Sequence, residues 1–530
     1  MSDRFERHAF TFTALTLVSR FTGLAREAAL SRVFGVGIVM DAFTFAFMVP
    51  NLFRRLFGEG ALAAAFVPIY TQLDRDDPAM ARKLATLLIG GLIIVLGGIT
   101  LLGEIALFAF SHAQDHDHLA ARLMMITLPY MPLVCLVAIL GAMLQVHGRF
   151  GPSAAAPVIL NLCVITAAIL FGFQNHANPD QRTHISLVAA SIIAAGAIQV
   201  AWMLLALRKH HWFESSTRQA GGALRRVIAQ AGPMILGLGV RQLNTFIDGL
   251  IASYPATIGA TIFGIEYPLK EGAMASLSYA QRLYEFPLGV FGIAVATAIF
   301  PALARLAPDR AAFADTLRRG LRLVIFIGLP ASAGLMLVRE PLTAVILQGG
   351  DFTAADTARV SFVLLGYAPA IWAYSMTHVL TRAFYAHGDS KTPVKVAVSI
   401  VGLNLILNCT LIWTALNVAG LAWSTAICAV VQVIILLRLV RRHSGPLVGP
   451  PVWQNWMKSA IVTATMAAAV WIVSQLLPET LTGWWGSVAE LAALVATGAI
   501  VVVLGSLSLK MPELAWALGR GSESSAVSRD

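Results

Sequence analysis

The feature that most constrains this chain is a succession of apolar segments, each about 18 residues or longer and so able to cross a lipid bilayer as a helix. We count about fourteen of them. Charged residues make up only 12% of the chain, against about 25% in a typical soluble protein. The sequence therefore predicts an all-α polytopic membrane protein. The segments are 9–30, 40–72, 84–110, 120–146, 153–173, 185–207, 225–254, 272–303, 321–338, 358–385, 393–415, 418–437, 457–477 and 487–508.

Lysine and arginine are distributed unevenly between alternate loops. With the N-terminus in the cytoplasm, the cytoplasmic loops and the two termini hold about 25 of these residues and the other loops about 5. This asymmetry follows the positive-inside rule, and it predicts an even number of helices with both termini in the cytoplasm. Because topology accounts for the net charge of +10, we expect no nucleic-acid partner.

A long basic connection at 211–226 follows the first six segments and suggests two lobes. A weak internal similarity supports the division, since laying 15–27 on 235–248 places Arg20 beside Arg241 and Glu27 beside Asp248. Transporters are often built from such repeats, with the substrate site between them. The predicted organisation is an N-terminal lobe 1–210, the connection 211–226, a second lobe 227–442, an additional helix pair within 453–508 and a polar cytoplasmic tail 511–530.

Three arginines inside apolar segments have no full set of partners in the sequence: Arg20, Arg54 and Arg282. A charge at the centre of a bilayer costs at least about 2.5–3.5 kcal/mol, so such residues usually face a wet cavity or a partner. Arg20 and Glu27 share a helical face but lie about 10 Å apart along the axis, too far for a direct ion pair. The planar guanidinium suits phosphate and carboxylate, and we therefore expect an anionic substrate such as a diphosphate.

Other charged residues of these segments have candidate partners. Asn51 lies one turn before Arg54 and on nearly the same side, so Arg54 is expected to face the cavity. Arg55 has Glu59 at i+4 and is expected to be structural. For Arg282, an intrahelical pair with Glu285 and ligand binding remain equally open. We expect Asp41 to pair with an arginine of the first helix.

A second polar cluster combines Asp248 with Asn404 and Asn408, which lie one turn apart. A carboxylate with carboxamide oxygens can bind sodium, and ordinary hydrogen bonding between helices is the alternative. The sequence contains no Ser/His/Asp constellation, glycine-rich phosphate loop or HExxH motif. We therefore expect no enzyme and no organic cofactor.

Four stretches carry a family resemblance: "SRFTGLARE", "MDAFTFAFMVPNLFRRLFGEGALAAAFVPIY", "YAQRLYEFPLGVFGIAVATAIFPALA" and "GDSKTPVKVAV". They closely resemble the MurJ (MviN) family of bacterial lipid II flippases, within the multidrug/oligosaccharidyl-lipid/polysaccharide (MOP) transporter superfamily. The resemblance runs from about Thr11 to Gly505. It implies two six-helix lobes that form a V-shaped central cavity, with the last two helices lining a groove for the lipid tail.

The resemblance also implies a function and a site. Such a protein flips lipid II, an undecaprenyl-diphosphate disaccharide-pentapeptide, from the cytoplasmic to the periplasmic leaflet of the bacterial inner membrane by alternating access, for peptidoglycan synthesis. Membrane lipids and other proteins of cell-wall synthesis are the further partners it implies. The family's cavity arginines fall on Arg20, Arg26, Arg54 and Arg282, with Glu27 as the acidic residue that follows the second. Its sodium site falls near Asp248, Asn404, Asn408 and Thr425.

Two other functions remain open from the sequence. A cation-coupled drug exporter of the same superfamily should have a carboxylate-lined cavity, and the arginines disfavour it. A non-transporting scaffold of envelope synthesis should tolerate Arg→Ala changes in the cavity.

Overall fold

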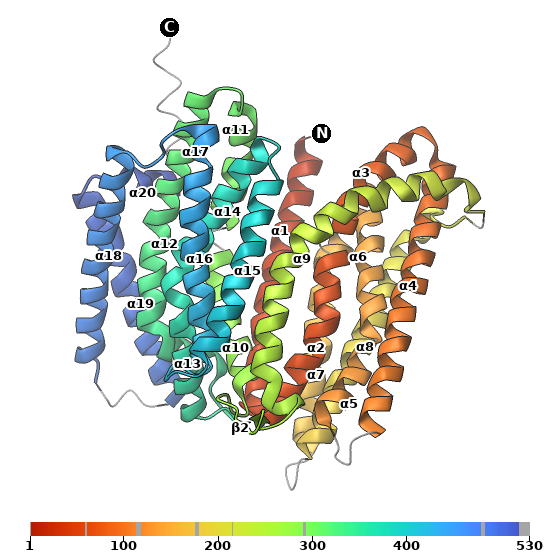
Figure 1. Ribbon diagram of the computed structural model, residues 1–530, viewed down its shortest axis with the longest axis horizontal. Helices are drawn as coiled ribbons and strands as arrows, with labels where there is room; N and C mark the ends of the chain where they lie inside the picture. The colour runs from red at the N-terminus through yellow and green to blue at the C-terminus, as the bar shows by residue number, and fades with distance from the viewer. Residues whose placement is uncertain are drawn as a thin grey trace. The chain divides into compact units, whose positions relative to one another are not determined.

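The computed structural model describes residues 2–58, 61–112, 118–174, 180–214, 216–289, 293–478 and 483–518. Over these residues the chain is almost entirely helical, with one short hairpin (Figure 1). Helices are expected because a bilayer offers no water to the backbone, whose polar groups must then bond within their own segment. The predicted all-α class is confirmed.

The first compact unit comprises Met1–Ala275 and the turn Gly349–Phe352. Within it, α7 packs against both α1 and α8, while α9 packs against α2 and α3. Gly249 of α9 allows one of these close approaches, because a Cβ there would lie 2.5 Å from the sulfur of Met48. The elements are α1 (Ser2–Phe34), α2 (Ile38–Phe53), the π-helical turn η1 (Arg54–Gly58), α3 (Ala61–Asp76), α4 (Pro78–His112), α5 (Leu119–Thr127), α6 (Tyr130–Val146), α7 (Gly151–Gln174), α8 (Gln181–Leu207), η2 (Arg208–His210), η3 (Arg218–Ala220), α9 (Gly221–Thr257), β1 (Thr261–Ile262) and β2 (Ile265–Glu266).

The second compact unit comprises Ser276–Gln348 and Thr353–Asp530. Its longest helix, α12, packs against α14, α18 and α19. The elements are α10 (Ala273–Pro287, whose first residues belong to the first unit), α11 (Ile293–Leu306), α12 (Arg310–Leu347), α13 (Ala354–Tyr367), η5 (Ala368–Ala370), α14 (Ile371–Ala386), α15 (Lys391–Leu411), α16 (Ala419–Leu439), α17 (Arg441–Ser444), α18 (Pro450–Leu476), α19 (Gly483–Ser508) and α20 (Pro512–Ala517).

Ten helical stretches of the described chain are long and apolar enough to cross a membrane, and each coincides with a predicted segment. The described residues of the other predicted segments, 9–30, 40–72, 225–254 and 272–303, are also largely helical but too polar or too interrupted to qualify. They include the segments with the four candidate arginines. Charged residues in helices of this length are expected where the helix faces protein or water rather than lipid.

The compact units divide the chain at a different place from the predicted lobes. The predicted second lobe begins at residue 227, whereas α9 packs with α2 and α3 and the first unit extends to Ala275. The predicted lobes were defined by the order of the helices and by the weak repeat, whereas the compact units are defined by contacts between residues. The long helix α9 therefore begins the predicted second lobe but packs within the first compact unit.

The C-terminal region differs from the predicted polar tail 511–530. Residues Pro512–Ala517 form α20, and Glu513 within it is buried. Glu513 Oε1 lies 2.5 Å from Nη2 of Arg322 on α12, and the guanidinium of Arg322 also lies over the Trp516 ring, 5.1 Å from its centroid. This ion pair fastens α20 to α12, and residues 519–530 lie outside the described chain.

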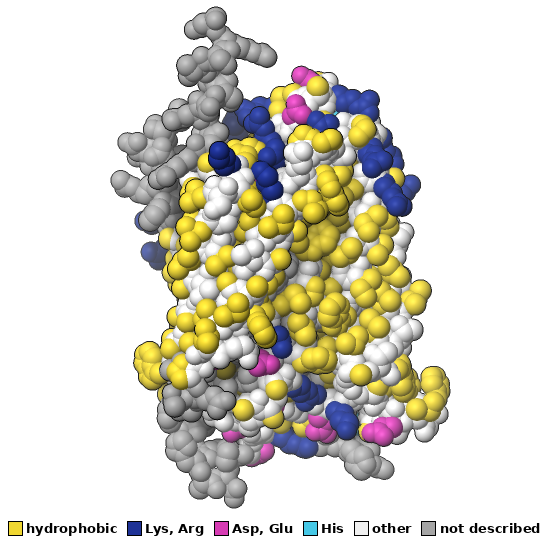
Figure 2. Space-filling model, turned by 90° about the vertical axis from the view of Figure 1, so that its left-hand side faces the viewer, with side chains coloured by type: hydrophobic (Ala, Val, Ile, Leu, Met, Phe, Trp, Pro, Cys, Tyr) yellow, Lys and Arg dark blue, Asp and Glu magenta, His cyan; other side chains and the backbone are white. Residues whose placement is uncertain are grey.

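The surface of the protein carries many large apolar side chains. Ile94 and Leu102 of α4 and Leu476 of α18 expose 68–75% of their area. In Figure 2, hydrophobic side chains cover much of the middle of the face shown, and most Lys and Arg side chains lie towards its two ends. This distribution is that of a surface in contact with a bilayer.

Candidate functional site

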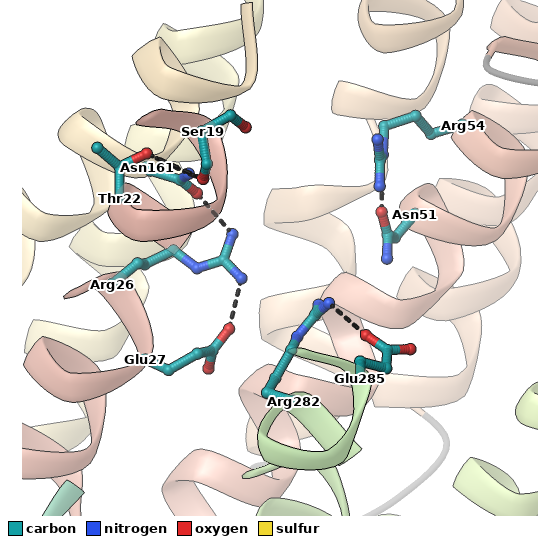
Figure 3. Close-up of polar contacts among 9 residues, drawn as sticks. All are labelled: Ser19, Thr22, Arg26, Glu27, Asn51, Arg54, Asn161, Arg282 and Glu285. Carbon is teal, nitrogen blue, oxygen red and sulfur yellow. Dashed lines mark hydrogen bonds and ion pairs between the residues drawn. The ribbon is translucent and has the colours of Figure 1, made fainter. Parts of the chain in front are cut away.

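Arg26 lies at the centre of a polar network between α1 and α7 (Figure 3). Its Nη2 is 2.5 Å from Oε1 of Glu27, and its Nη1 donates to Oδ1 of Asn161 at 3.1 Å. Asn161 in turn donates to Oγ1 of Thr22 at 3.0 Å and to the carbonyl of Ser19 at 3.3 Å. Glu27 and Asn161 are buried and the Arg26 side chain is 12% exposed. The network therefore neutralises Arg26 and joins two helices.

Arg20 differs from Arg26, although the two lie on the same helix. Its side chain is exposed, and no hydrogen bond or ion pair joins it to another residue of the described chain. This agrees with the prediction that Glu27 is too far along the axis to reach it. An exposed guanidinium keeps its donors available to a ligand.

Arg54 is the first residue of the π-helical turn η1, which follows Pro50 in α2. Its Nε donates to Oδ1 of Asn51 at 2.8 Å (Figure 3). Because a π turn has more residues per turn than an α-helix, the angle of about 100° between Arg54 and Arg55 that α-helical geometry predicts does not apply here. Such turns are frequent at functional sites.

Arg55 bonds to a residue of another helix. Its Nη1 donates to Oε1 of Gln242 on α9 at 3.5 Å, and Gln242 is buried. The predicted partner, Glu59, lies outside the described residues. The contact gives Arg55 a position between η1 and α9, which agrees with a structural role.

Arg282 forms the intrahelical pair that its spacing allows. Its Nη1 is 3.4 Å from Oε2 of Glu285, and both side chains are 35% exposed (Figure 3). Such a half-exposed pair contributes about 0–1 kcal/mol, so it does not prevent Arg282 from binding an anion. Tyr284, between them in sequence, stacks on Tyr367 at a centroid distance of 4.5 Å and lies tilted against Tyr374 at 5.6 Å, which holds α10 against α13 and α14.

Asp41 caps the N-terminus of α10. It is fully buried, and its two oxygens accept hydrogen bonds from the backbone N–H groups of Gly272 at 2.6 Å and Ala275 at 2.7 Å. These two N–H groups belong to the helix end, where backbone donors have no acceptor within the helix. Through them Asp41 fastens the N-terminus of α10, and its pairing with an arginine of the first helix stays a prediction.

Replacing Asp41 with Asn is expected to lower the free energy of unfolding by about 2 kcal/mol, because an NH2 group would then face a buried N–H donor. The measurement is the apparent melting temperature of the purified protein. Asp309→Asn is the matched control, since Asp309 caps α12 from an exposed position through bonds to Ala311 and Ala312. Equal shifts for the two variants would contradict this role of Asp41.

The residues of the predicted sodium site fall into two groups. Asp248 is buried in the first unit and accepts from Nδ2 of Asn244 at 3.5 Å. In the second unit, Asn404 donates to Ser424, Ser424 to Asn408, and Asn408 to Asn404, which closes a buried ring of hydrogen bonds. The Thr425 hydroxyl donates to the carbonyl of Leu421 in its own helix.

In this ring the amide oxygen of Asn408 accepts from Ser424 on α16, and that of Asn404 accepts from Asn408 one turn along α15. Within the described residues, no group of three or more His, Cys, Asp or Glu side chains is arranged to hold a metal ion. When Na+ replaces K+ in the buffer at about 100 mM, we expect the free energy of unfolding to rise by less than about 0.5 kcal/mol. A sodium-specific rise in the melting temperature that disappears in Asn408→Ala would contradict this prediction.

Three partners in these networks were not singled out from the sequence: Asn161, Gln242 and Ser424. Asn161 and Ser424 are polar residues in otherwise apolar helices, and that position is the signal that marks them. Gln242 lies among other polar residues of α9 and carries no such signal. The sequence alone, however, does not indicate which helix each one contacts.

Comparison with known proteins identifies the family. A sequence model described as "Lipid II flippase MurJ" matches residues 30–490. The "Probable lipid II flippase MurJ" of Vibrio cholerae is 31% identical over 466 residues, which cover 83% of this chain and 83% of that protein. These matches confirm the resemblance seen in the sequence motifs.

Two solved structures share the fold. The first is described as "Lipid II flippase MurJ, inward closed conformation" and has a TM-score of 0.76 at 22% identity, covering 96% of this chain and 99% of that one. The second, an inward-facing multidrug resistance MATE family transporter of the MOP superfamily, has a TM-score of 0.61 at 13% identity, covering 82% and 97%. At these identities the structures support the fold alone. Because the family model matches residues 30–490 and the Vibrio relative is 31% identical over most of the chain, this protein belongs to the MurJ family of lipid II flippases.

Proposed function

We propose that this protein flips lipid II across the membrane, with the diphosphate bound by arginines of its less apolar helices. The observation that carries the proposal is the family match over 30–490, which includes Arg54 and Arg282. The arginines support it because guanidinium groups pair well with phosphate. The transport step makes and breaks no covalent bond, so no catalytic group is required.

Transport would run from the cytoplasmic to the periplasmic leaflet by alternating access. In this scheme the diphosphate is held by Arg20, Arg54 and Arg282, and Arg26 acts within its network with Glu27 and Asn161. The polyprenyl tail stays in lipid beside α18 and α19, whose exposed apolar side chains support such a path. These include Trp471, Leu476, Val495 and Leu504.

The location follows from charge and hydropathy. The excess of lysine and arginine on alternate loops supports placement in the bacterial inner membrane with both termini in the cytoplasm. Other proteins of cell-wall synthesis would be its partners, because they make and consume lipid II.

The membrane potential is expected to reset the transporter. Moving one positive charge across 100 mV is worth about 2.3 kcal/mol, which corresponds to about a 40-fold shift between two states. An inside-negative potential should therefore return the empty, cationic site to the inward-facing state. Collapsing the potential with an ionophore should reduce both transport and the inward-facing population. The prediction fails if neither quantity changes.

The function itself is tested by complementation. The native flippase of a bacterial host is depleted, this protein is supplied, and lipid II in the outer leaflet is measured. Rescue of growth with precursor at the outer leaflet supports the proposal. Growth without outward movement of precursor through this protein, or no rescue despite normal membrane insertion, contradicts it.

A further inference from the structure

A groove of about 560 Å³ lies in the first unit, where the loop between α6 and α7 meets the end of α8. None of the candidate cavity arginines lines it. Its lining includes two arginines, here called the polar end, and apolar side chains that include Trp202 and Leu205, here called the apolar wall; no lining residue is acidic. The residues that decide its chemistry are Arg149, Phe150, Gly151, Trp202, Leu205 and Arg208.

The polar end is suited to a phosphate group. Arg149 is exposed, and its Nη1 donates to the carbonyl of Ala206 at 2.8 Å, which fixes the guanidinium and leaves other donors available. Arg208 is also exposed. Gly151 begins the 24-residue helix α7, whose first N–H groups have no acceptor within the helix and favour an anion.

The apolar wall belongs to a helix that meets the surrounding lipid. Trp202 and Leu205 lie on α8, within a stretch apolar enough to span a membrane. Leu205 is 60% exposed, and Ile198, about two turns earlier, is 50% exposed. An occupant whose charged head meets the arginines would therefore have its apolar part along α8.

The corresponding loop of the second unit shows that the arginine is specific to this groove. His147 and His387 end α6 and α14 in the same way, and each is followed by a glycine with positive φ, 74° at Gly148 and 71° at Gly388. The next residue is Arg149 in one loop and Asp389 in the other.

Asp389 gives the second loop the opposite charge. Burial opposes ionisation of this residue, but hydrogen bonds from Thr392 and His443 hold the pKa of the Asp389 carboxyl below its ordinary value. The two loops therefore share a backbone form, and only the one at Arg149 is suited to an anion.

We propose that this groove binds the phosphate headgroup of an anionic glycerophospholipid from the surrounding leaflet, with an acyl chain against Trp202 and Leu205. The charges of the groove complement the headgroup, and its wall opens onto the lipid-facing surface of α8. The positive-inside rule places the headgroup at the cytoplasmic side. This inference concerns binding at the outer surface and stands or falls independently of transport.

The test uses the full-length protein in nanodiscs of phosphatidylcholine with increasing phosphatidylglycerol, one lipid at a time carrying dibrominated acyl chains. Bromine quenches tryptophan fluorescence on contact, and the difference between wild type and Trp202→Phe isolates Trp202 among the 11 tryptophans. Brominated phosphatidylglycerol is expected to quench Trp202 at a lower mole fraction than brominated phosphatidylcholine. The preference should be about tenfold.

Arg208→Ala should lower that preference about tenfold. Lys209→Ala is the matched control, because Lys209 is the next residue, is exposed, carries the same charge and does not line the groove. It should change the preference by less than about threefold. Equal effects of the two substitutions would mean diffuse surface attraction and would overturn the proposal.

Two further measurements test whether the groove binds an anionic lipid. Equal quenching by the two brominated lipids would also overturn the proposal, because it would show no selectivity for charge. Displacement of the brominated lipid by inorganic phosphate would show that the groove takes a free anion and would overturn the assignment to a lipid. Retention of the lipid in excess phosphate supports it.

Discussion

Arg54→Ala and Arg282→Ala are each expected to reduce lipid II transport by about 10- to 100-fold. A hydrogen bond to a charged group contributes about 1.5–3 kcal/mol, and in the proposed site each change removes one such interaction with the diphosphate. Arg54 lies in the π-helical turn η1 beside Asn51, and Arg282 forms a half-exposed pair with Glu285. The measurement is complementation of a flippase-depleted strain at matched expression, with outer-leaflet lipid II as the readout.

Arg122→Ala is the control for loss of one positive charge. Arg122 is an exposed arginine near the beginning of α5, where its long side chain can reach the headgroups, so transport should be close to wild type. Arg54→Lys keeps the charge but loses the planar fork, and it should give an intermediate rate. If Arg54→Ala and Arg282→Ala transport as well as Arg122→Ala, these arginines serve folding or topology and another site must bind the substrate.

Glu513→Ala is expected to lower the free energy of unfolding by about 3 kcal/mol. The side chain of Glu513 is 1% exposed and that of Arg322 is 22% exposed, so the change leaves a largely buried guanidinium without its carboxylate. The change should also weaken the attachment of α20 to α12, because it removes the ion pair and leaves the contact between the Arg322 guanidinium and Trp516. The measurement is the apparent melting temperature in detergent, together with protease sensitivity of the C-terminal region.

Glu340→Ala provides the matched control for this prediction. Glu340 pairs with Arg339 at 3.6 Å and its side chain is 62% exposed, so its removal should cost about 0–1 kcal/mol. Replacing both Arg322 and Glu513 with apolar residues should restore much of the stability, since no buried charge then remains unpaired. If Glu513→Ala and Glu340→Ala have equal effects, the buried pair does not hold α20.

Short-range spacing indicated which residues could reach one another. Asn51 bonds to Arg54 and Glu285 pairs with Arg282, and in both pairs the residues are three positions apart in continuous helical chain. Side chains at that spacing lie on one helical face whatever surrounds the helix. The π turn at Arg54–Gly58 limits this reasoning, because it changes the angle between successive side chains and no residue pattern in the sequence indicated it.

Spacing within one helix does not predict contacts between residues on different helices. Arg26 bonds to Asn161, 135 positions away, and Asp41 bonds to the backbone of Gly272 and Ala275, more than 200 positions away. Backbone donors carry no side-chain signal, so a sequence search for a partner of Asp41 considers only charged side chains. The buried position of Glu513 was missed for a similar reason, because a short polar segment after the last apolar helix has the composition of a solvated tail.

The sequence by itself determined that this is a helical membrane protein, where most of its spans lie and which helices carry arginines. It could do so because the thickness of a bilayer sets the length of a span and the cost of a buried charge marks the exceptions. Only the tertiary structure decided which charges are neutralised, as Arg26 is by Glu27 and Asn161, and which remain exposed, as Arg20 does. The physical reason is that a partner on another helix depends on how the helices pack, and packing is a property of the whole chain rather than of any one segment.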